Sequence, residues 1–166
     1  MNIFFLSFDV IECAELYCDQ HVIKILLEIV QMLYTAHDQE FVKKFAPYNK
    51  MKTRRGYKGA HKNHPMTMWV RESRKNYNFA VNLGISLAIE YNNRFNKIHA
   101  CSKHIMWLHD NIPTFSNEKS KTAVYSKQGI PLCMPEIHHN EDVITAYKSY
   151  YTTKTFGRFT RSQVIN

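Results

Sequence analysis

The segment from Ile11 to Thr35 places the strongest constraint on the fold, because it predicts a long helix that is apolar on almost every side. Asp9 precedes it and Glu12 follows three residues later, which is the capping-box pattern of a helix start. Apolar residues recur at helical spacing along one side, and further isoleucines, leucines and valines fill other sides. A helix this apolar is largely buried, so we expect it in the core of the protein.

The rest of the chain predicts further helices. Pro65 suits the first turn of a second long helix, where its missing N–H is not needed. With only 5 Gly and 5 Pro, the sequence disfavours an all-β fold, which needs many tight turns. We therefore expect the all-α class and a single compact domain over residues 1–166, with about four helices and a short extended or strand-like N-terminal segment. The predicted helices cover residues 11–35, 66–95, 102–109 and 141–153.

The sequence contains no evident membrane span or secretion signal. No stretch reaches the ~18 uninterrupted apolar residues of a membrane helix, and the apolar N-terminus lacks a basic region and a cleavage site. None of the four cysteines forms a CxxC pair, so we expect reduced thiols rather than zinc ligands or disulfides. These features predict a cytoplasmic protein, in the host cell cytoplasm if it is viral, with no membrane partner.

Four polar residues form one stripe on the first predicted helix. His21, Lys24, Glu28 and Gln31 are spaced by three, four and three residues, so their side chains share one face. An amine beside a carboxylate can attack a carbonyl-like carbon while the carboxylate moves protons, and a histidine can act as a base. The alternative is an ordinary Lys24–Glu28 ion pair on a solvated face. We name His21, Lys24 and Glu28 as candidate catalytic residues.

The excess of basic over acidic residues is concentrated in one run of the chain, from Lys43 to Lys75. The chain carries +8 overall, with 22 Lys and Arg against 14 Asp and Glu. Between Lys43 and Lys75, eleven basic residues face a single acid, Glu72, which gives this run +10. Such an excess favours nucleic acid as the partner, although a merely soluble basic protein is the alternative. The predicted contacts from this run are Arg54, Arg55, Lys58, Arg71 and Lys75.

Two further motifs adjoin helix ends. His61, Asn63 and His64 directly precede the second long helix, where they could contact a phosphate or a base. Two surface histidines, or a metal site that would need further ligands, are the alternatives, and we expect no metal or other cofactor. Near the C-terminus, aromatic residues alternate with cations from Tyr147 to Arg161, a pattern that suits stacked bases and phosphates. Tyr147, Lys148 and Tyr151 are predicted contacts there, with core packing of the tyrosines as the alternative.

These residues resemble a known family. Asp19-Gln20-His21 followed by Glu28, together with Tyr147-Lys148-Ser149-Tyr150-Tyr151, resembles the pyrimidine-dimer DNA glycosylase family of the phage endonuclease V type. The stretch from Gly59 to Arg94 is similar to bacterial relatives of that family. The chain is also similar to a group of uncharacterised phage proteins with a Cys-Asp-x-His-Val-x-Lys signature, here Cys18 to Lys24. The resemblance implies a small, basic, all-α enzyme that acts on DNA.

The family's mechanism gives the stripe a specific role. Its N-terminal α-amine attacks the sugar C1′ and forms an imine with the help of a glutamate, which would correspond to Glu28. The family exposes a threonine after methionine removal, whereas Asn2 is bulky enough to retain Met1, so the amine would belong to Met1. Two arginines that help the family bind DNA correspond to Leu27 and Gln31. Lys24 is a second amine close to Glu28, which the family does not predict.

The sequence thus predicts a DNA-binding base-excision enzyme, a DNA glycosylase that also has AP-lyase activity in one version of the hypothesis. Met1 or Lys24 would supply the amine and Glu28 the carboxylate. One alternative is an enzyme that processes a nucleotide or modified base on the same scaffold. Another is a non-catalytic viral protein that binds nucleic acid or counters host defence. The oligomeric state is left open.

Overall fold

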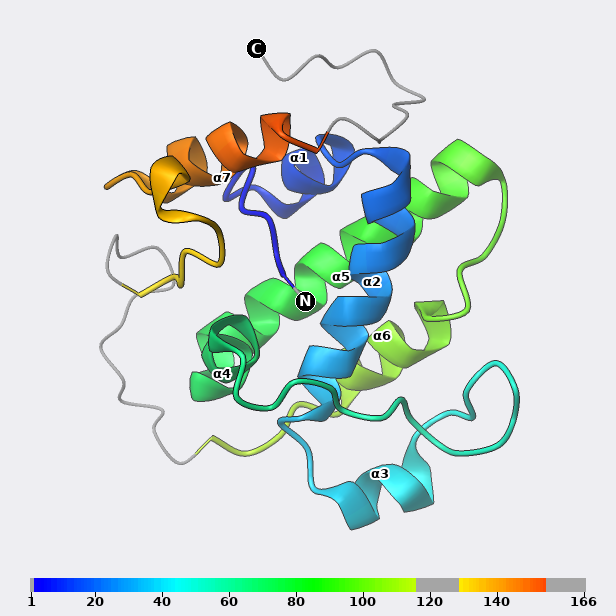
Figure 1. Cartoon of the computed structure of the whole chain (residues 1–166). Coiled ribbons are helices and arrows are strands. Elements are labelled where there is room, and N and C mark those ends of the chain that lie inside the picture. The colour runs from blue at the N-terminus through cyan, green and yellow to red at the C-terminus, as the bar shows by residue number, and fades with distance from the viewer. Residues whose placement is uncertain (1, 116–128, 155–166) are drawn as a thin grey trace.

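The computed structural model describes residues 2–115 and 129–154, which fold as helices around one apolar core (Figure 1). This confirms the all-α class. Within these residues there are seven α-helices and no β-strand, so the expected number of about four helices was too low. The helices are α1 (Val10–Glu15), α2 (Asp19–Tyr34), α3 (Gln39–Phe45), α4 (Pro65–Glu72), α5 (Arg74–Phe95), α6 (Ser102–Asp110) and α7 (Val143–Thr152), and a 3-10 turn, η1, covers Glu136–His138.

The first predicted helix is in fact two helices, α1 and α2. Asp9 caps α1 as expected, accepting the N–H groups of Ile11 and Glu12. The Glu12 carboxylate, however, binds the Ser7 hydroxyl instead of closing a capping box. The chain then leaves the helical path, and Cys18 begins α2 from an extended conformation (φ −68°, ψ 158°). The hydrophobic periodicity continued across this junction, which is why it did not reveal the break.

The second predicted helix is also divided, at Ser73. This residue is extended (φ −147°, ψ 157°), and its hydroxyl caps α5 by accepting the N–H of Asn76. The Asn76 side chain in turn donates to the carbonyl of Trp69 in α4, at 2.8 Å. Pro65 lies in the first turn of α4, as predicted. Asp38 starts an additional helix, α3, within the stretch expected to be a connection.

Close packing of α2, α5 and α6 forms the centre of the molecule (Figure 1). Gly84 of α5 makes this possible, because a Cβ there would lie 2.6 Å from Ile105 Cδ1 in α6 and 3.3 Å from Ile29 Cγ2 in α2. Three helices therefore meet at a position where a side chain would force them apart. Ile29, on the face of α2 opposite the solvent, is fully buried, as the apolar composition of this segment predicted.

The N-terminal segment is extended rather than a strand, and Ile3–Leu6 are buried. Tyr17, at the junction of α1 and α2, fastens it. The Tyr17 hydroxyl accepts the N–H of Phe4 at 2.9 Å and donates to the Phe4 carbonyl at 2.8 Å. This directs the first described residue, Asn2, toward α2, where its backbone N–H donates to Glu28.

Gly56 shapes the long basic connection between α3 and α4. Its φ of +64° lies in the left-handed region, and a Cβ would meet Val42 Cγ1 at 2.5 Å. Further along, Gly59 packs against Thr35, so the connection crosses the end of α2 on its way to α4 (Figure 1). The cysteines Cys13, Cys18, Cys101 and Cys133 are all free thiols. No helix in the described part of the chain is long and apolar enough to cross a membrane.

Candidate active site

A polar pocket of about 290 Å³ opens where the N-terminal segment, α2 and α7 meet. It brings three of the four stripe residues together with side chains from distant parts of the sequence. The fourth, Gln31, does not line it. The lining residues are Asn2, Phe4, His21, Lys24, Ile25, Glu28, Cys133, Tyr150 and Lys154.

Glu28 is the more buried member of the Lys24–Glu28 pair in this pocket. Only 12% of its side chain is exposed, whereas the side chain of Lys24 is 70% exposed. Glu28 Oε2 accepts the backbone N–H of Asn2 at 2.9 Å, and Lys24 Nζ lies 3.7 Å from Oε1. The carboxylate is therefore held between the start of the described chain and a solvent-facing ammonium, rather than lying on an open surface.

The side chain of Asn2 is clamped as well. Its Nδ2 donates to the carbonyl of Cys133 at 3.0 Å, and its Oδ1 lies 3.3 Å from the hydroxyl of Tyr147. Tyr147 also donates to the carbonyl of Pro131 at 2.7 Å. Two segments more than 100 residues away in sequence thus fix the position from which Asn2 reaches Glu28.

Tyr151 holds the ring of His21 in place. The Tyr151 hydroxyl accepts the N–H of Cys18 at 2.8 Å and lies 2.9 Å from His21 Nδ1. The hydroxyl donates to Nδ1 or accepts from it according to which ring nitrogen carries the proton. Burial, together with the smaller effect of the positive charges of Lys24 and Lys154, lowers the pKa of His21 to about 4. His21 is therefore neutral at physiological pH and stacks on Phe4, with ring centroids 4.8 Å apart.

His64 extends the site toward the basic connection. It is the N-cap of α4, where its Nδ1 accepts the N–H of Met66 at 3.2 Å. Burial lowers the pKa of His64, as do the positive N-terminus and His61, whereas the Glu28 carboxylate raises it. This residue is therefore within electrostatic range of Glu28. His61, by contrast, is exposed with a φ of +49°.

The basic run from Lys43 to Lys75 exposes some of its predicted contacts and uses others structurally. Lys58, His61, Asn63 and Lys75 are exposed, and Arg54 and Arg71 are half-buried. The Arg55 guanidinium donates to the carbonyl of Ala46 at 2.9 Å and stacks over Tyr48 at 4.3 Å. Arg55 therefore shapes the connection, whereas the exposed residues are available to a ligand.

The structure corrects the C-terminal prediction for two residues. Tyr147 and Tyr151 are 0% and 3% exposed, so their rings are core groups and cannot stack on a nucleic acid in this arrangement. Lys148 is half-buried. At the pocket, Lys154 lies over the ring of Tyr150 at 4.0 Å and donates to its hydroxyl at 2.7 Å. The predicted residue Met1 and the aromatic and basic residues from 155 to 161 lie outside the described part.

Asp19, part of the Asp-Gln-His run, has a structural partner that the sequence did not reveal. Arg94, at the end of α5, donates to the Asp19 carboxylate at 2.9 Å and to Glu90 at 2.7 Å. The same guanidinium donates to the carbonyls of Tyr17 at 2.7 Å and Glu15 at 3.0 Å, which lie at the break between α1 and α2. The i, i+4 spacing of Glu90 and Arg94 indicated only the first half of this network.

Six of the lining residues were not among the predicted site residues. Ile25 lies on α2 itself, whereas no sequence spacing connects the other five to this helix: Asn2, Phe4, Cys133, Tyr150 and Lys154. Across the described ranges, no group of three His, Cys, Asp or Glu residues has a metal-binding arrangement. Comparisons with protein-family models, with characterised proteins and with solved structures found no match to the chain.

Proposed function

We propose that the protein is a DNA-binding base-excision enzyme, a glycosylase with lyase activity, that uses an amine nucleophile beside Glu28. One observation carries the proposal: the 2.9 Å hydrogen bond from the Asn2 backbone N–H to Glu28 Oε2. By bond lengths alone, the α-amine of the preceding residue is then within about 7 Å of this carboxylate. An amine and a carboxylate at this separation can act on one sugar carbon.

The chemistry follows from these two groups. The nitrogen lone pair of the Met1 amine forms a bond to C1′, and the glycosidic bond breaks as the base leaves with the electron pair. Glu28 accepts the proton that the amine loses and delivers it to O4′ as the C1′–O4′ bond opens, which leaves a protonated imine between protein and sugar, while the departing base anion takes a proton from water. Removal of a C2′ proton then expels the 3′ phosphate and cuts the strand.

The neighbouring groups suit a DNA backbone. Lys24 and Lys154 both lower the pKa of His21, so each is close enough to act on the same region of the pocket. They provide positive charge for the phosphates on either side of an extruded nucleotide. The exposed Lys58 and Lys75 extend positive charge along the connection and α5. Lys24 is the second amine that could form the imine.

Strand scission tests the proposal. Duplex DNA with an abasic site, and duplex DNA with a pyrimidine dimer, would be incubated with the protein and analysed for cleavage. The proposal predicts cleavage of at least one substrate, with loss of cleavage in Glu28→Gln. Glu40→Gln is the matched control, because Glu40 is an exposed glutamate on α3 that pairs only with Lys43 in the described structure. Absence of cleavage of both substrates would contradict the proposal.

A further inference from the structure

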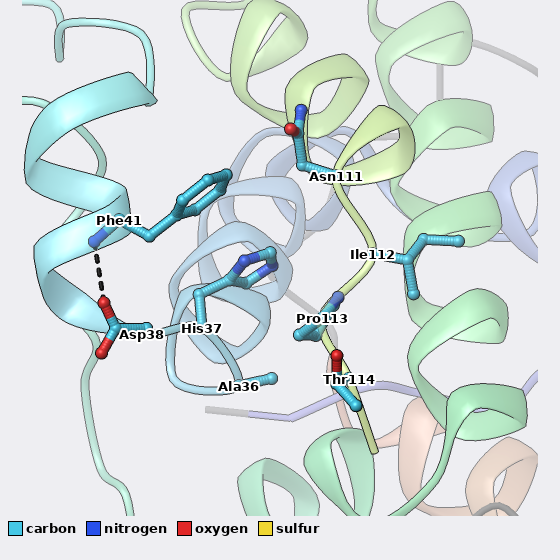
Figure 2. A pocket seen from close by; sticks show the side chains of 8 residues that line it. All are labelled: Ala36, His37, Asp38, Phe41, Asn111, Ile112, Pro113 and Thr114. Atoms are coloured by element: carbon cyan, nitrogen blue, oxygen red, sulfur yellow. Dashed lines mark hydrogen bonds between the residues drawn. The ribbon is translucent and has the colours of Figure 1, made fainter.

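A second, larger pocket lies at the other end of α2 and takes no part in the proposed reaction. It has a volume of about 600 Å³ and lies between the end of α2, the start of α3 and the segment that follows α6. Figure 2 shows the imidazole of His37 between the ring of Phe41 and Pro113. The lining is completed by Ala36, Asp38, Asn111, Ile112 and Thr114. A pocket of this volume is in the range that holds small organic ligands.

His37 presents a lone pair to this pocket. The Tyr77 hydroxyl donates its one proton to the carbonyl of Leu108 at 3.0 Å, so the 2.7 Å contact with His37 Nε2 requires the ring nitrogen to donate. Burial lowers the pKa of His37 to about 4, so the ring is neutral and Nδ1 carries no proton. No described residue donates to Nδ1. His37 is therefore a fixed hydrogen-bond acceptor.

Two further side chains of the lining, Asp38 and Asn111, also offer acceptors, while the Thr114 hydroxyl can donate or accept. One oxygen of Asp38, Oδ1, accepts the N–H of Phe41 at 2.8 Å, as Figure 2 shows, and no described residue donates to Oδ2. The Nδ2 of Asn111 donates one of its two N–H groups to the carbonyl of Trp107 at 2.9 Å, and no described residue donates to its Oδ1. The lining of one pocket thus contains an imidazole, a carboxylate and an amide with acceptor atoms, together with the aromatic ring of Phe41.

We infer that this pocket binds a neutral, amino-substituted heteroaromatic ring, of which the amino-bearing nucleobases are the natural examples. A ligand must bring N–H donors, because the three acceptors would otherwise be desolvated without partners. It should be planar, because the lining includes the aromatic ring of Phe41, on which a flat ring can stack. The carboxylate of Asp38 opposes an anion, and the +8 charge of the protein opposes a cation.

Matched nucleosides test the inference by titration calorimetry on the full chain. Adenosine and cytidine carry the amino group, whereas purine riboside and pyrimidin-2-one riboside differ from them by lacking it. We expect measurable binding of the first pair and affinity about five- to tenfold lower for the second. Equal binding within the pairs, no binding of any nucleoside at millimolar concentration, or binding of benzamidine alone would overturn the inference.

Variants then locate the binding. Asp38→Ser removes the carboxylate but keeps a side chain that caps α3, so the fold should be retained, and we expect about tenfold weaker adenosine binding. Asp110→Ser is the control, because Asp110 is an exposed carboxylate at the end of α6 outside the pocket lining. His37→Phe keeps an aromatic ring without the acceptor and should weaken binding as well. Unchanged affinity in Asp38→Ser and His37→Phe would place any binding elsewhere and refute this site.

Discussion

The backbone N–H of Asn2 donates to the carboxylate of Glu28, although 26 positions separate the two residues. The extended N-terminal segment makes this possible, because Tyr17 holds Phe4 and the Asn2 side chain is bound to the carbonyl of Cys133. The start of the described chain is thus a built part of the pocket. Its position depends on contacts from α1, α2 and the segment before α7.

Loss of the Glu28 charge should abolish turnover without unfolding the protein. Glu28→Gln can still accept the N–H of Asn2, so the pocket geometry should persist. The amide cannot take up a proton from the amine, and we expect strand cleavage to fall at least about 100-fold. Single-turnover cleavage with abasic DNA measures this, and circular dichroism checks the fold. A variant that cleaves at the wild-type rate would exclude Glu28 as the proton carrier.

The Arg94 network should be essential for stability. Arg94→Met removes the guanidinium from Asp19 and Glu90, both of which are largely buried, and from two backbone carbonyls. We expect the free energy of unfolding to fall by about 3–5 kcal/mol in urea titrations. Lys103→Met, at an exposed position of α6, should change it by less than about 0.5 kcal/mol. Similar losses in both variants would show that the network does not stabilise the fold.

Stability should decrease in mild acid. Burial lowers the pKa of His21, His37 and His104 to about 4, against an ordinary value of 6.5. Between these values the unfolded chain binds protons that the folded protein does not. The stabilisation is therefore complete above pH 6.5 and is lost as the pH falls toward 4, by up to about 1.4 kcal/mol per pH unit for each histidine.

Urea titrations at a series of pH values measure this effect. His37→Phe should reduce the slope by about one proton, because one of the three histidines no longer titrates. A free energy of unfolding that stays constant between pH 6.5 and 5 would contradict the assignment of neutral, buried histidines. The readout is independent of any activity, so it tests the description of the sites without assuming the proposed reaction.

DNA binding should depend on the exposed basic connection. Neutralising Lys58 and Lys62 together should weaken binding and reduce the slope of log affinity against log salt by about 0.9 for each lost phosphate contact. Neutralising the exposed Lys97 and Lys103, which lie outside the connection, changes the net charge equally and should leave the slope nearly unchanged. Fluorescence anisotropy at several salt concentrations compares the two variants. Equal changes would mean that only net charge matters.

The sequence predicted the fold class, but it did not predict where the two long helical segments are divided. Hydrophobic periodicity identified both long helical segments, because it reports which face is buried. It did not identify the breaks at Cys18 and Ser73, since each break preserves the burial pattern and depends on partners elsewhere in the chain. Arg94 satisfies carbonyls at the first break, and the Ser73 hydroxyl caps the helix after the second. Such tertiary partners leave no local signal.

Sequence spacing predicted only those residues of the candidate site that lie on one helix, α2. The spacing of His21, Lys24 and Glu28 placed them on one face, and all three line the pocket. The residues that complete it come from the N-terminal segment and α7, whose positions follow from packing. The same limit applies to the prediction that Tyr147 and Tyr151 contact nucleic acid. A segment in which aromatic and basic residues alternate is compatible with a surface or with a core. Burial, which a single sequence does not report, assigns these two tyrosines to the core.

The most direct measurement is borohydride trapping, followed by peptide mapping of the trapped residue. Reduction during incubation with abasic DNA would convert the imine into a stable amine that links protein and DNA. We expect a trapped species in wild-type protein, linked through the amine of Met1, and much less of it in Glu28→Gln. Mapping to Lys24 would move the nucleophile to the second amine beside the same carboxylate. The absence of any trapped species, or a link to a lysine far from Glu28, would contradict the proposed reaction.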